Sequence, residues 1–249
     1  APPVELFREM VHKVVQLNAR FIPPYGHGAT LYIRPLLIGT SPEVGVKPSE
    51  EYLLIMFVVP VGPYFKEGFK PVDMMICRDF DRAAPQGTGT VKVGGNYAAS
   101  LQSLAIAKKA GFSSTIYLDA KEKKYIDECG PANFFGIKNK TYITPQSESI
   151  LPSITNKSLQ QLAEHLGYKV EKRPVPFEEL AEFEEVAECG TAAVITPIRK
   201  IVDPIANKTF TYGDPETPGP VCTELYNVYT AIQFGETEDI FGWTEVVDV

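Results

Sequence analysis

Apolar side chains recur at helical spacing near the start of the chain, at positions 7, 10, 11, 14 and 17 of the segment 4–20. This period places one apolar stripe along a helix. A second helix is predicted over 155–166, where Ser153 or Thr155 could cap its first turn. A third is predicted over 218–234, which carries apolar side chains at helical intervals.

Between the predicted helices, short apolar runs bounded by Gly and Pro predict strands. The run 30–39 contains Pro35, which favours an edge or a bulge. Residues 51–61 are almost continuously apolar and too short to span a membrane, so they predict a central strand. Further strands are predicted at 72–77, 111–119 and 168–175, and a short acidic helix follows at 177–183.

Composition narrows the classes of function. The 249 residues are 44% hydrophobic and 11% aromatic, enough for a substantial core, and the net charge of -7 argues against nucleic acid or an acidic membrane as a partner. The four cysteines are widely spaced, with no Cys-x-x-Cys and no His at zinc-ligand spacing. We therefore expect free thiols in a reducing cytoplasm and no metal site.

The segment Gly87-Thr-Gly-Thr-Val-Lys92-Val-Gly-Gly-Asn-Tyr97 crowds glycines around one lysine. Glycine allows close backbone approach, which is typical of a ligand site. A phosphate-binding Walker loop requires Gly-Lys-Ser/Thr, and a dinucleotide fingerprint requires a third Gly that is absent after Gly89, so neither fits. A Gly-rich turn with a solvated lysine remains an alternative at this point.

Three further patterns are compatible with chemistry. Tyr32 and Arg34 lie two apart on a predicted strand and therefore share a face. Glu128 precedes a Gly-Pro turn, where an ordinary turn carboxylate is the simpler interpretation. The segment 144–155 ends a strand and opens a helix, so its free backbone N–H groups form a natural anion site.

Taken together, these segments resemble the branched-chain aminotransferases, which are fold-type IV pyridoxal-phosphate enzymes. The lysine segment is similar to the family pattern Gly-x-Lys-x-Gly-Gly-Asn-Tyr, and Glu128 begins the pattern Glu-x-Gly-x-x-Asn-Phe-Phe. The strand Leu-Tyr-Ile-Arg-Pro at 31–35, Ser-Ile-Leu-Pro-Ser-Ile-Thr at 149–155 and Glu-Cys-Gly-Thr-Ala-Ala at 188–193 also match, the latter two most closely the bacterial branch.

The resemblance implies a role for each matching residue. Lys92 would hold pyridoxal phosphate covalently and act as the catalytic base and acid, Tyr97 would bond the ring O3′, and Glu128 would bond the pyridine nitrogen. The phosphate would be held by Ser149, Ile150 and Thr191. The substrate would be contacted by Tyr32, Arg34, Val46, Ala192 and, as a lid residue, Tyr64. The implied reaction is transamination of L-leucine, L-isoleucine and L-valine with 2-oxoglutarate, by a cytoplasmic homodimer.

The resemblance also implies an α+β fold, with a partial small α/β domain and a larger pseudo-barrel β domain flanked by helices. The expected division is 1–63 for the rest of the small domain, 64–80 for an interdomain loop and 81–249 for the large cofactor-binding domain. The family carries further N-terminal residues that include a phosphate-binding Arg. We therefore expect this chain to be truncated, cofactor-poor and weakly active. Another fold-type IV enzyme, such as a D-amino acid aminotransferase or aminodeoxychorismate lyase, and an inactive fragment are the alternatives.

Overall fold

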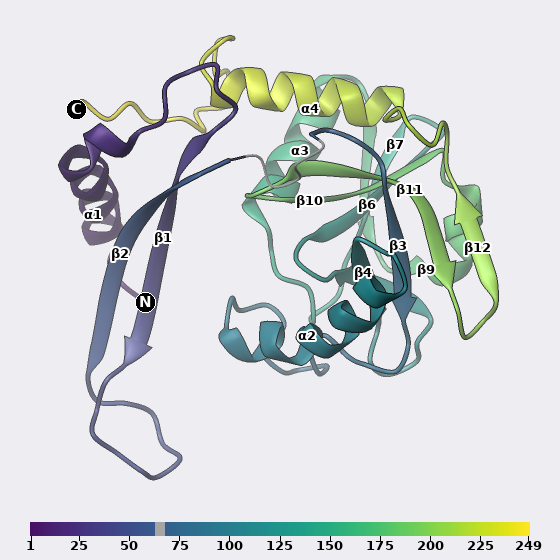
Figure 1. The fold of residues 1–249 in the computed structure, drawn as a ribbon, viewed down its shortest axis with the longest axis horizontal. Coiled ribbons are helices and arrows are strands. Elements are labelled where there is room, and N and C mark those ends of the chain that lie inside the picture. Colours follow the sequence, from purple (N-terminus) through teal and green to yellow (C-terminus); the bar gives the residue numbers. More distant parts are fainter. Residues whose placement is uncertain (63–67) are drawn as a thin grey trace. The chain divides into compact units, whose positions relative to one another are not determined.

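A computed structural model describes residues 1–62 and 68–249 of the chain. Its contacts divide the chain into two compact units (Figure 1). Unit 1 comprises Ala1–Lys66 and Asp239–Val249, and unit 2 comprises Glu67–Glu238. Within the described residues, no helix is long and apolar enough to cross a membrane.

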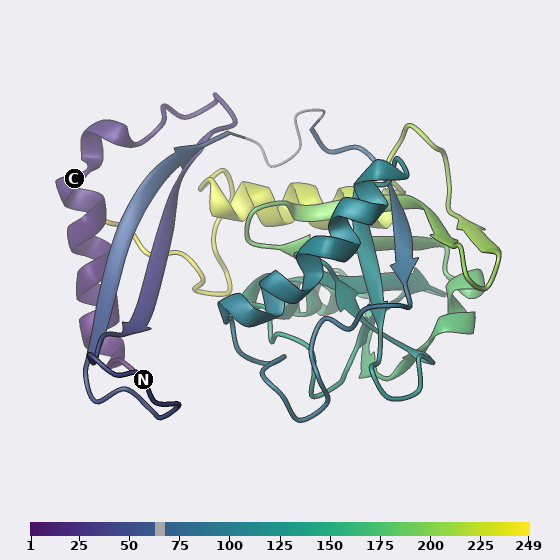
Figure 2. The ribbon, with the colours of Figure 1, turned by 60° about the horizontal axis from the view of Figure 1, so that its bottom comes forward.

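Unit 1 is built from one helix and one hairpin. Helix α1 (Val4–Leu17) is followed by a short 3₁₀ turn, η1 (Ala19–Phe21), and by strands β1 (Thr30–Gly39) and β2 (Tyr52–Val61). Strands β1 and β2 pair antiparallel in one continuous register, from Thr30 opposite Val61 to Gly39 opposite Tyr52. Figure 2 shows α1 lying along this hairpin, and α1 contacts β2. The helix and both strands are therefore confirmed.

The prediction that residues 51–61 form a central strand is wrong. Among the described residues, β2 pairs only with β1 in a two-stranded sheet. Tyr52, Leu53, Phe57 and Val59 of β2 are consequently exposed, despite their apolar character. A continuous apolar run signals burial on both faces of a strand, and here the described partners cover only part of it.

The last residues of the chain belong to unit 1, although the predicted division placed them in the large domain. Glu245 accepts hydrogen bonds from Arg8 and His12 of α1 (2.7 Å each), and Gln16 donates to the carbonyl of Asp248 (3.0 Å). These polar contacts anchor the tail along the exposed side of the first helix.

Unit 2 contains a ten-stranded mixed sheet and three α-helices. The order across the sheet is β8-β7-β6-β10-β11-β3-β4-β5-β9, with β12 paired to β11. The strands are β3 (Val72–Cys77), β4 (Ser114–Leu118), β5 (Tyr125–Cys129), β6 (Asn133–Lys138), β7 (Thr141–Pro145), β8 (Lys169–Arg173), β9 (Val175–Pro176), β10 (Glu185–Gly190), β11 (Val194–Asp203) and β12 (Lys208–Thr211). The helices are α2 (Gly94–Lys109), α3 (Ile154–His165) and α4 (Pro220–Gln233), with a 3₁₀ helix η2 (Phe177–Glu182).

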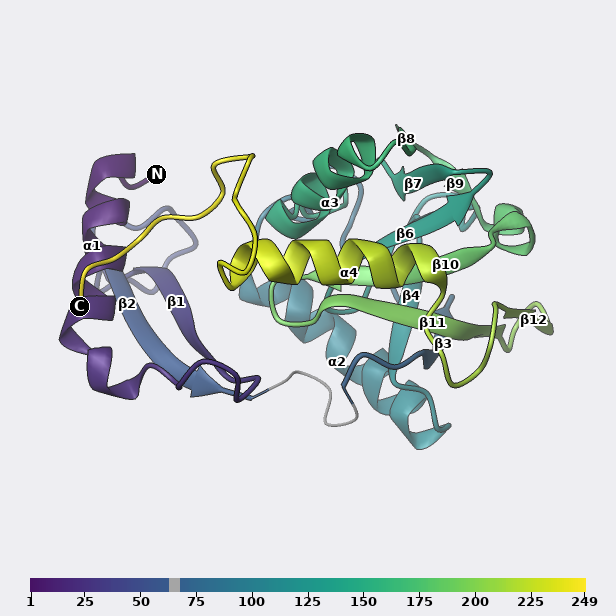
Figure 3. The ribbon, with the colours of Figure 1, turned by 90° about the horizontal axis from the view of Figure 1, so that it is seen from above.

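The helices cover the sheet from different sides. Helices α3 and α4 lie side by side, as Figure 3 shows from above, and contact β8, β10 and β11, whereas α2 contacts β3 and β4. The sheet also curls, because β5 contacts both β6 and β7 from the far end of the strand order. This curvature gives the pseudo-barrel that the resemblance implied.

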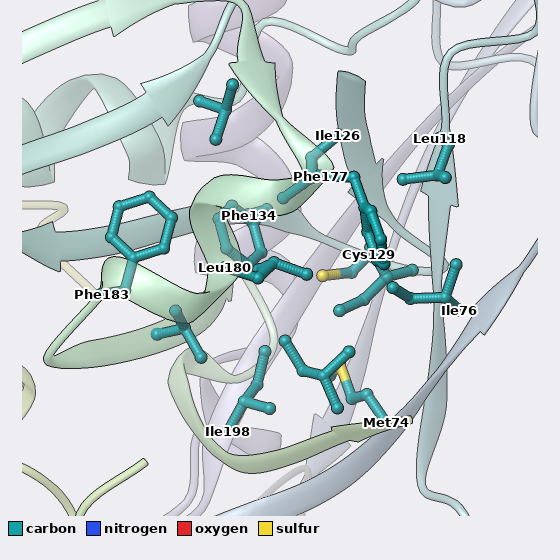
Figure 4. Packing of buried hydrophobic residues seen from close by; sticks show 14 of the residues in the cluster. Met74, Ile76, Leu118, Ile126, Cys129, Phe134, Phe177, Leu180, Phe183 and Ile198 are labelled. Atoms are coloured by element: carbon teal, nitrogen blue, oxygen red, sulfur yellow. The ribbon is translucent and has the colours of Figure 1, made fainter. Parts of the chain in front are cut away.

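The interior of the curled sheet is a single apolar cluster (Figure 4). Phe134 of β6 is fully buried there and meets Phe183 edge to face, with ring centroids 6.1 Å apart. Its neighbour Phe135 points to the other face and stacks on Tyr142 at 4.6 Å. Because both faces are covered, the strands of unit 2 are buried along nearly their whole length, and the cluster fixes the strand ends that carry the site.

Residues 72–77 differ from the predicted division, which included them in an interdomain loop. They form β3, whose pairing partners are β11 and β4, and Met74 and Ile76 contribute to the core. The apolar side chains of this segment explain its burial within unit 2.

Candidate cofactor site

The lysine loop is fixed by the side chain of Asn96 in the first turn of α2. Its Nδ2 donates to the carbonyls of Thr88 (2.7 Å) and Val91 (3.0 Å), and its Oδ1 accepts from the Thr88 hydroxyl (2.8 Å). Asn96 is buried, so these bonds satisfy an amide that would otherwise be costly to bury. The loop that presents Lys92 is therefore a shaped turn, not a free one.

Lys92 itself is exposed at the end of this loop. Its Nζ donates to the phenol oxygen of Tyr97 at 2.5 Å, and Tyr97 lies in the first part of α2. The amine is thus accessible to a ligand and already oriented by a phenol. This pairing favours a reactive amine over the alternative of a solvated lysine in an ordinary turn.

Glu128 lies near the end of β5 and is only 3% exposed. Its Oε2 accepts from the Asn133 amide (2.8 Å), its Oε1 accepts from the Leu151 backbone N–H (3.1 Å), and Arg82 forms an ion pair with it. Burial raises the pKa of Glu128 to about 7, and the positive charge of Arg82 opposes that rise. A buried carboxyl that titrates near neutrality is suited to a protonated ring nitrogen.

The segment before α3 is a serine-rich loop with internal hydrogen bonds. Ser147 donates its hydroxyl to Asp127 (2.8 Å) and accepts from the backbone N–H of Ser149 (3.1 Å). Ser153 accepts from the Asn156 N–H (3.2 Å) and is therefore the cap of α3. Ser149 is buried and Ile150 is half-buried at the turn that leads into this helix.

The lysine loop and the serine loop approach each other at Gly89. A Cβ atom at this position would lie 2.1 Å from the carbonyl oxygen of Ser149 and 2.6 Å from its Cα. No side chain fits there, so the glycine is required for the contact. The close approach places Lys92, three residues beyond Gly89, and Ser149 on neighbouring loops of unit 2.

The remaining predicted residue pairs occupy a turn and a strand. Thr191 and Ala192 lie exposed in the turn that joins β10 to β11, where Gly190 pairs with Val194. In unit 1, Tyr32 and Arg34 share a face of β1, with the guanidinium 5.0 Å from the ring centroid, as their spacing predicted. The full set of roles given to these residues stays a prediction.

Two predicted substrate residues are in loops. Val46 lies between β1 and β2 and is fully exposed. Tyr64 lies outside the described residues. The structure therefore gathers Lys92 with Tyr97, and Glu128 with the serine loop, inside unit 2.

Sequence reasoning missed the residues that hold these groups in place. Asn133 was available as the Asn of the Glu-x-Gly-x-x-Asn pattern, and Asn96 as that of Gly-Gly-Asn-Tyr, but neither was given a role. Arg82 carried no recognisable signal, because its contacts to Ser149 and Glu128 join segments distant in the chain.

Known proteins match this chain over nearly its whole length. A branched-chain-amino-acid aminotransferase of Helicobacter pylori is 49% identical over 242 residues, 96% of this chain and 70% of that protein. The crystal structure of the branched-chain amino acid aminotransferase of Escherichia coli is 31% identical, with a TM-score of 0.84, over 100% of this chain and 78% of that one. A Thermus branched-chain aminotransferase solved with pyridoxamine 5'-phosphate is 26% identical, with a TM-score of 0.82, over 98% of this chain and 76% of that one.

The donors in unit 2 suit the cofactor of such enzymes, since they combine an oriented amine, a buried carboxylate and a loop that opens a capped helix. The family model for amino-transferase class IV matches residues 2–201, which is most of the chain. The chain belongs to the class IV aminotransferases, a family of pyridoxal-phosphate enzymes.

Proposed function

We propose that this protein transfers amino groups from L-leucine, L-isoleucine and L-valine to 2-oxoglutarate, within branched-chain amino acid biosynthesis. The observation that carries the proposal is the pairing, within unit 2, of the Lys92–Tyr97 hydrogen bond with a buried carboxyl at Glu128. Identity of 49% to a named branched-chain-amino-acid aminotransferase supports the substrate class.

Pyridoxal phosphate, when bound, supplies an electron-withdrawing ring that stabilises negative charge at the amino acid Cα. Glu128 would hold the proton on the ring nitrogen, since its carboxylate is fixed by Asn133 and the Leu151 amide. Tyr97 would orient the ring through its phenol. The backbone of Ser149 and Ile150 and the hydroxyl of Thr191 would hold the phosphate.

Lys92 would perform the proton transfers. Its Nζ removes the proton from the amino acid Cα as a general base and returns a proton as a general acid. The phenol of Tyr97, which accepts from Nζ at 2.5 Å, orients the amine for that task. A neutral amine is required for the first step, so activity should rise as Lys92 loses its proton.

The substrate roles belong to a second set of residues. We propose that Tyr32, Val46 and Tyr64 contact the aliphatic side chain and that Arg34 and Ala192 serve the carboxylate. The shared face of Tyr32 and Arg34 supports this assignment. We also propose a cytoplasmic homodimer, which light scattering of the purified protein and cell fractionation would test.

Borohydride reduction in the presence of pyridoxal phosphate tests the function directly. We expect a visible absorption band that borohydride bleaches, with the label recovered on the peptide containing Lys92 and lost in Lys92→Ala. L-Leucine should be converted with 2-oxoglutarate, and D-alanine should not. Turnover of D-alanine in preference to L-leucine would indicate another class IV enzyme, and absence of any label would indicate an inactive protein.

A further inference from the structure

Arg82 joins three parts of the candidate site through one guanidinium group. Its Nη1 donates to the carbonyl of Ser149 (3.2 Å), and its Nη2 donates to the carbonyl of Gly89 (3.3 Å) and forms the ion pair with Glu128. The side chain is only 9% exposed. The fork geometry of arginine suits this task, since its donors point in fixed directions that a lysine amine cannot reproduce.

The three contacted groups belong to different functional parts. Gly89 lies in the lysine loop, Ser149 in the proposed phosphate loop, and Glu128 is the proposed partner of the pyridine nitrogen. Because Gly89 already touches Ser149 with no room for a Cβ, small movements of either loop would be transmitted to the other. Arg82 adds the carboxylate to that contact.

Resting on the function proposed above, we propose that Arg82 is a positioning residue that locks the lysine loop, the serine loop and Glu128 into one unit, so that the phosphate end and the pyridine end of the cofactor are held in register. Arg82 acts through these groups and is not assigned any contact with substrate.

The charge of Arg82 has a second consequence. The charged groups that act on Glu128 are Arg82, which favours ionisation, and the neighbouring Asp127, which disfavours it. Burial alone would keep the Glu128 carboxyl neutral to a higher pH. Loss of Arg82 therefore leaves Glu128 protonated at neutral pH, unable to hold a proton on the ring nitrogen.

Binding of pyridoxamine phosphate, measured by calorimetry across pH, tests the proposal without turnover or a bond to Lys92. We expect Arg82→Gln to weaken binding roughly 10- to 100-fold, because it removes charge-assisted hydrogen bonds. The pH at which binding reaches half its maximum should rise by about one unit or more. Arg82→Lys retains the charge but not the fork, so the pH midpoint should stay near that of the parent while binding remains weaker.

Arg78→Gln is the matched control. Arg78 lies in the same segment and forms its ion pair with the fully buried Asp203 (2.6 Å), away from both loops. We expect it to lower the unfolding temperature with little change in binding. Equal binding and an equal pH midpoint in Arg82→Gln and the parent would overturn the proposal.

A double-mutant cycle in the cofactor-free protein separates this proposal from the proposed function. Arg82→Gln, Glu128→Gln and the double variant should show a non-additive effect on unfolding, because the two side chains form a buried ion pair. Failure of the parent to bind pyridoxamine phosphate, with the cycle non-additive, would refute the function and leave the clamp standing. An additive cycle would refute the clamp.

Discussion

Unit 1 and unit 2 both contain strands of almost continuous apolar sequence, and they bury them very differently. In β1 and β2, Leu36, Leu37 and Leu53 are 43–49% exposed, whereas Phe134 and Phe135 of β6 are 0% exposed. Strand β6 has β7 and β10 as neighbours and covers on both faces, while β2 has β1 alone among the described strands. Burial is thus decided by the number of neighbouring elements as much as by side-chain character.

The same contrast applies to polar groups. Glu128 and Asn96 of unit 2 are buried and held by named hydrogen bonds, so each has one defined position. Arg34 and Val46 of unit 1 are exposed. Unit 2 therefore carries preorganised groups suited to a cofactor, and unit 1 carries groups whose proposed task is to recognise a variable substrate.

The largest expected effect is on the core of unit 2. Phe134→Ala should lower the free energy of unfolding by about 3–5 kcal/mol, because a fully buried aromatic leaves a cavity. Phe57→Ala on β2 removes a side chain that is 44% exposed and should cost less than about 1 kcal/mol. Denaturant unfolding of both variants measures the difference, and similar losses would remove the contrast between the units.

Glu188 provides the next largest effect. It is 1% exposed on β10, its Oε2 has no hydrogen-bond partner among the described residues, and the Cys129 thiol donates to the carboxyl. Burial raises the pKa of Glu188 to about 8 from an ordinary 4.5. The neutral form is favoured by folding, so its contribution is present below pH 4.5 and is lost as the pH rises through about 8.

Glu188→Gln should therefore match the parent near pH 5 and exceed it in stability by roughly 2–4 kcal/mol near pH 8. Thermal unfolding at the two pH values measures this gain. Thr196→Val is the control, since Thr196 lies opposite Glu188 in the β10–β11 register and does not titrate. Its effect should be the same at both pH values, and a gain from Glu188→Gln that did not depend on pH would contradict the assignment.

Asn96→Ala should have a smaller effect, roughly 1–3 kcal/mol, because it leaves the buried carbonyls of Thr88 and Val91 without their donor. Borohydride labelling of Lys92 should also slow as the loop loosens. Asn227→Ala changes an exposed residue of α4 and should stay within about 0.5 kcal/mol of the parent. Unchanged labelling in Asn96→Ala would show that the loop does not need this clamp.

Local patterns were sufficient to predict most elements, because helical spacing near residue 4 and the cap at Ser153 act over a few residues. The fold class and the pairing of Lys92 with a carboxylate came from the resemblance to a known family. Arg82 could not have been found in this way, since its three contacts lie 7, 46 and 67 residues away and depend on how β5 and the loops meet. The error at β2 has the same origin, as strand neighbours are a tertiary property.

Arg34 tests the other side of the comparison, where the expected effect on stability is smallest. Arg34→Lys should leave the free energy of unfolding within about 0.5 kcal/mol, because the side chain is exposed on β1. If Arg34 recognises a carboxylate, the KM for 2-oxoglutarate should rise about 10-fold, since lysine cannot make a bidentate contact.

Arg20→Lys is the matched variant for this test. Arg20 also belongs to unit 1 and lies 4.7 Å from the ring centroid of Phe21, much as Arg34 lies beside Tyr32. Both replacements preserve charge and disturb an arginine–aromatic contact, so only a role in substrate binding separates them. An equal change in KM for the two variants would assign the effect to unit 1 as a whole and remove Arg34 from the substrate site.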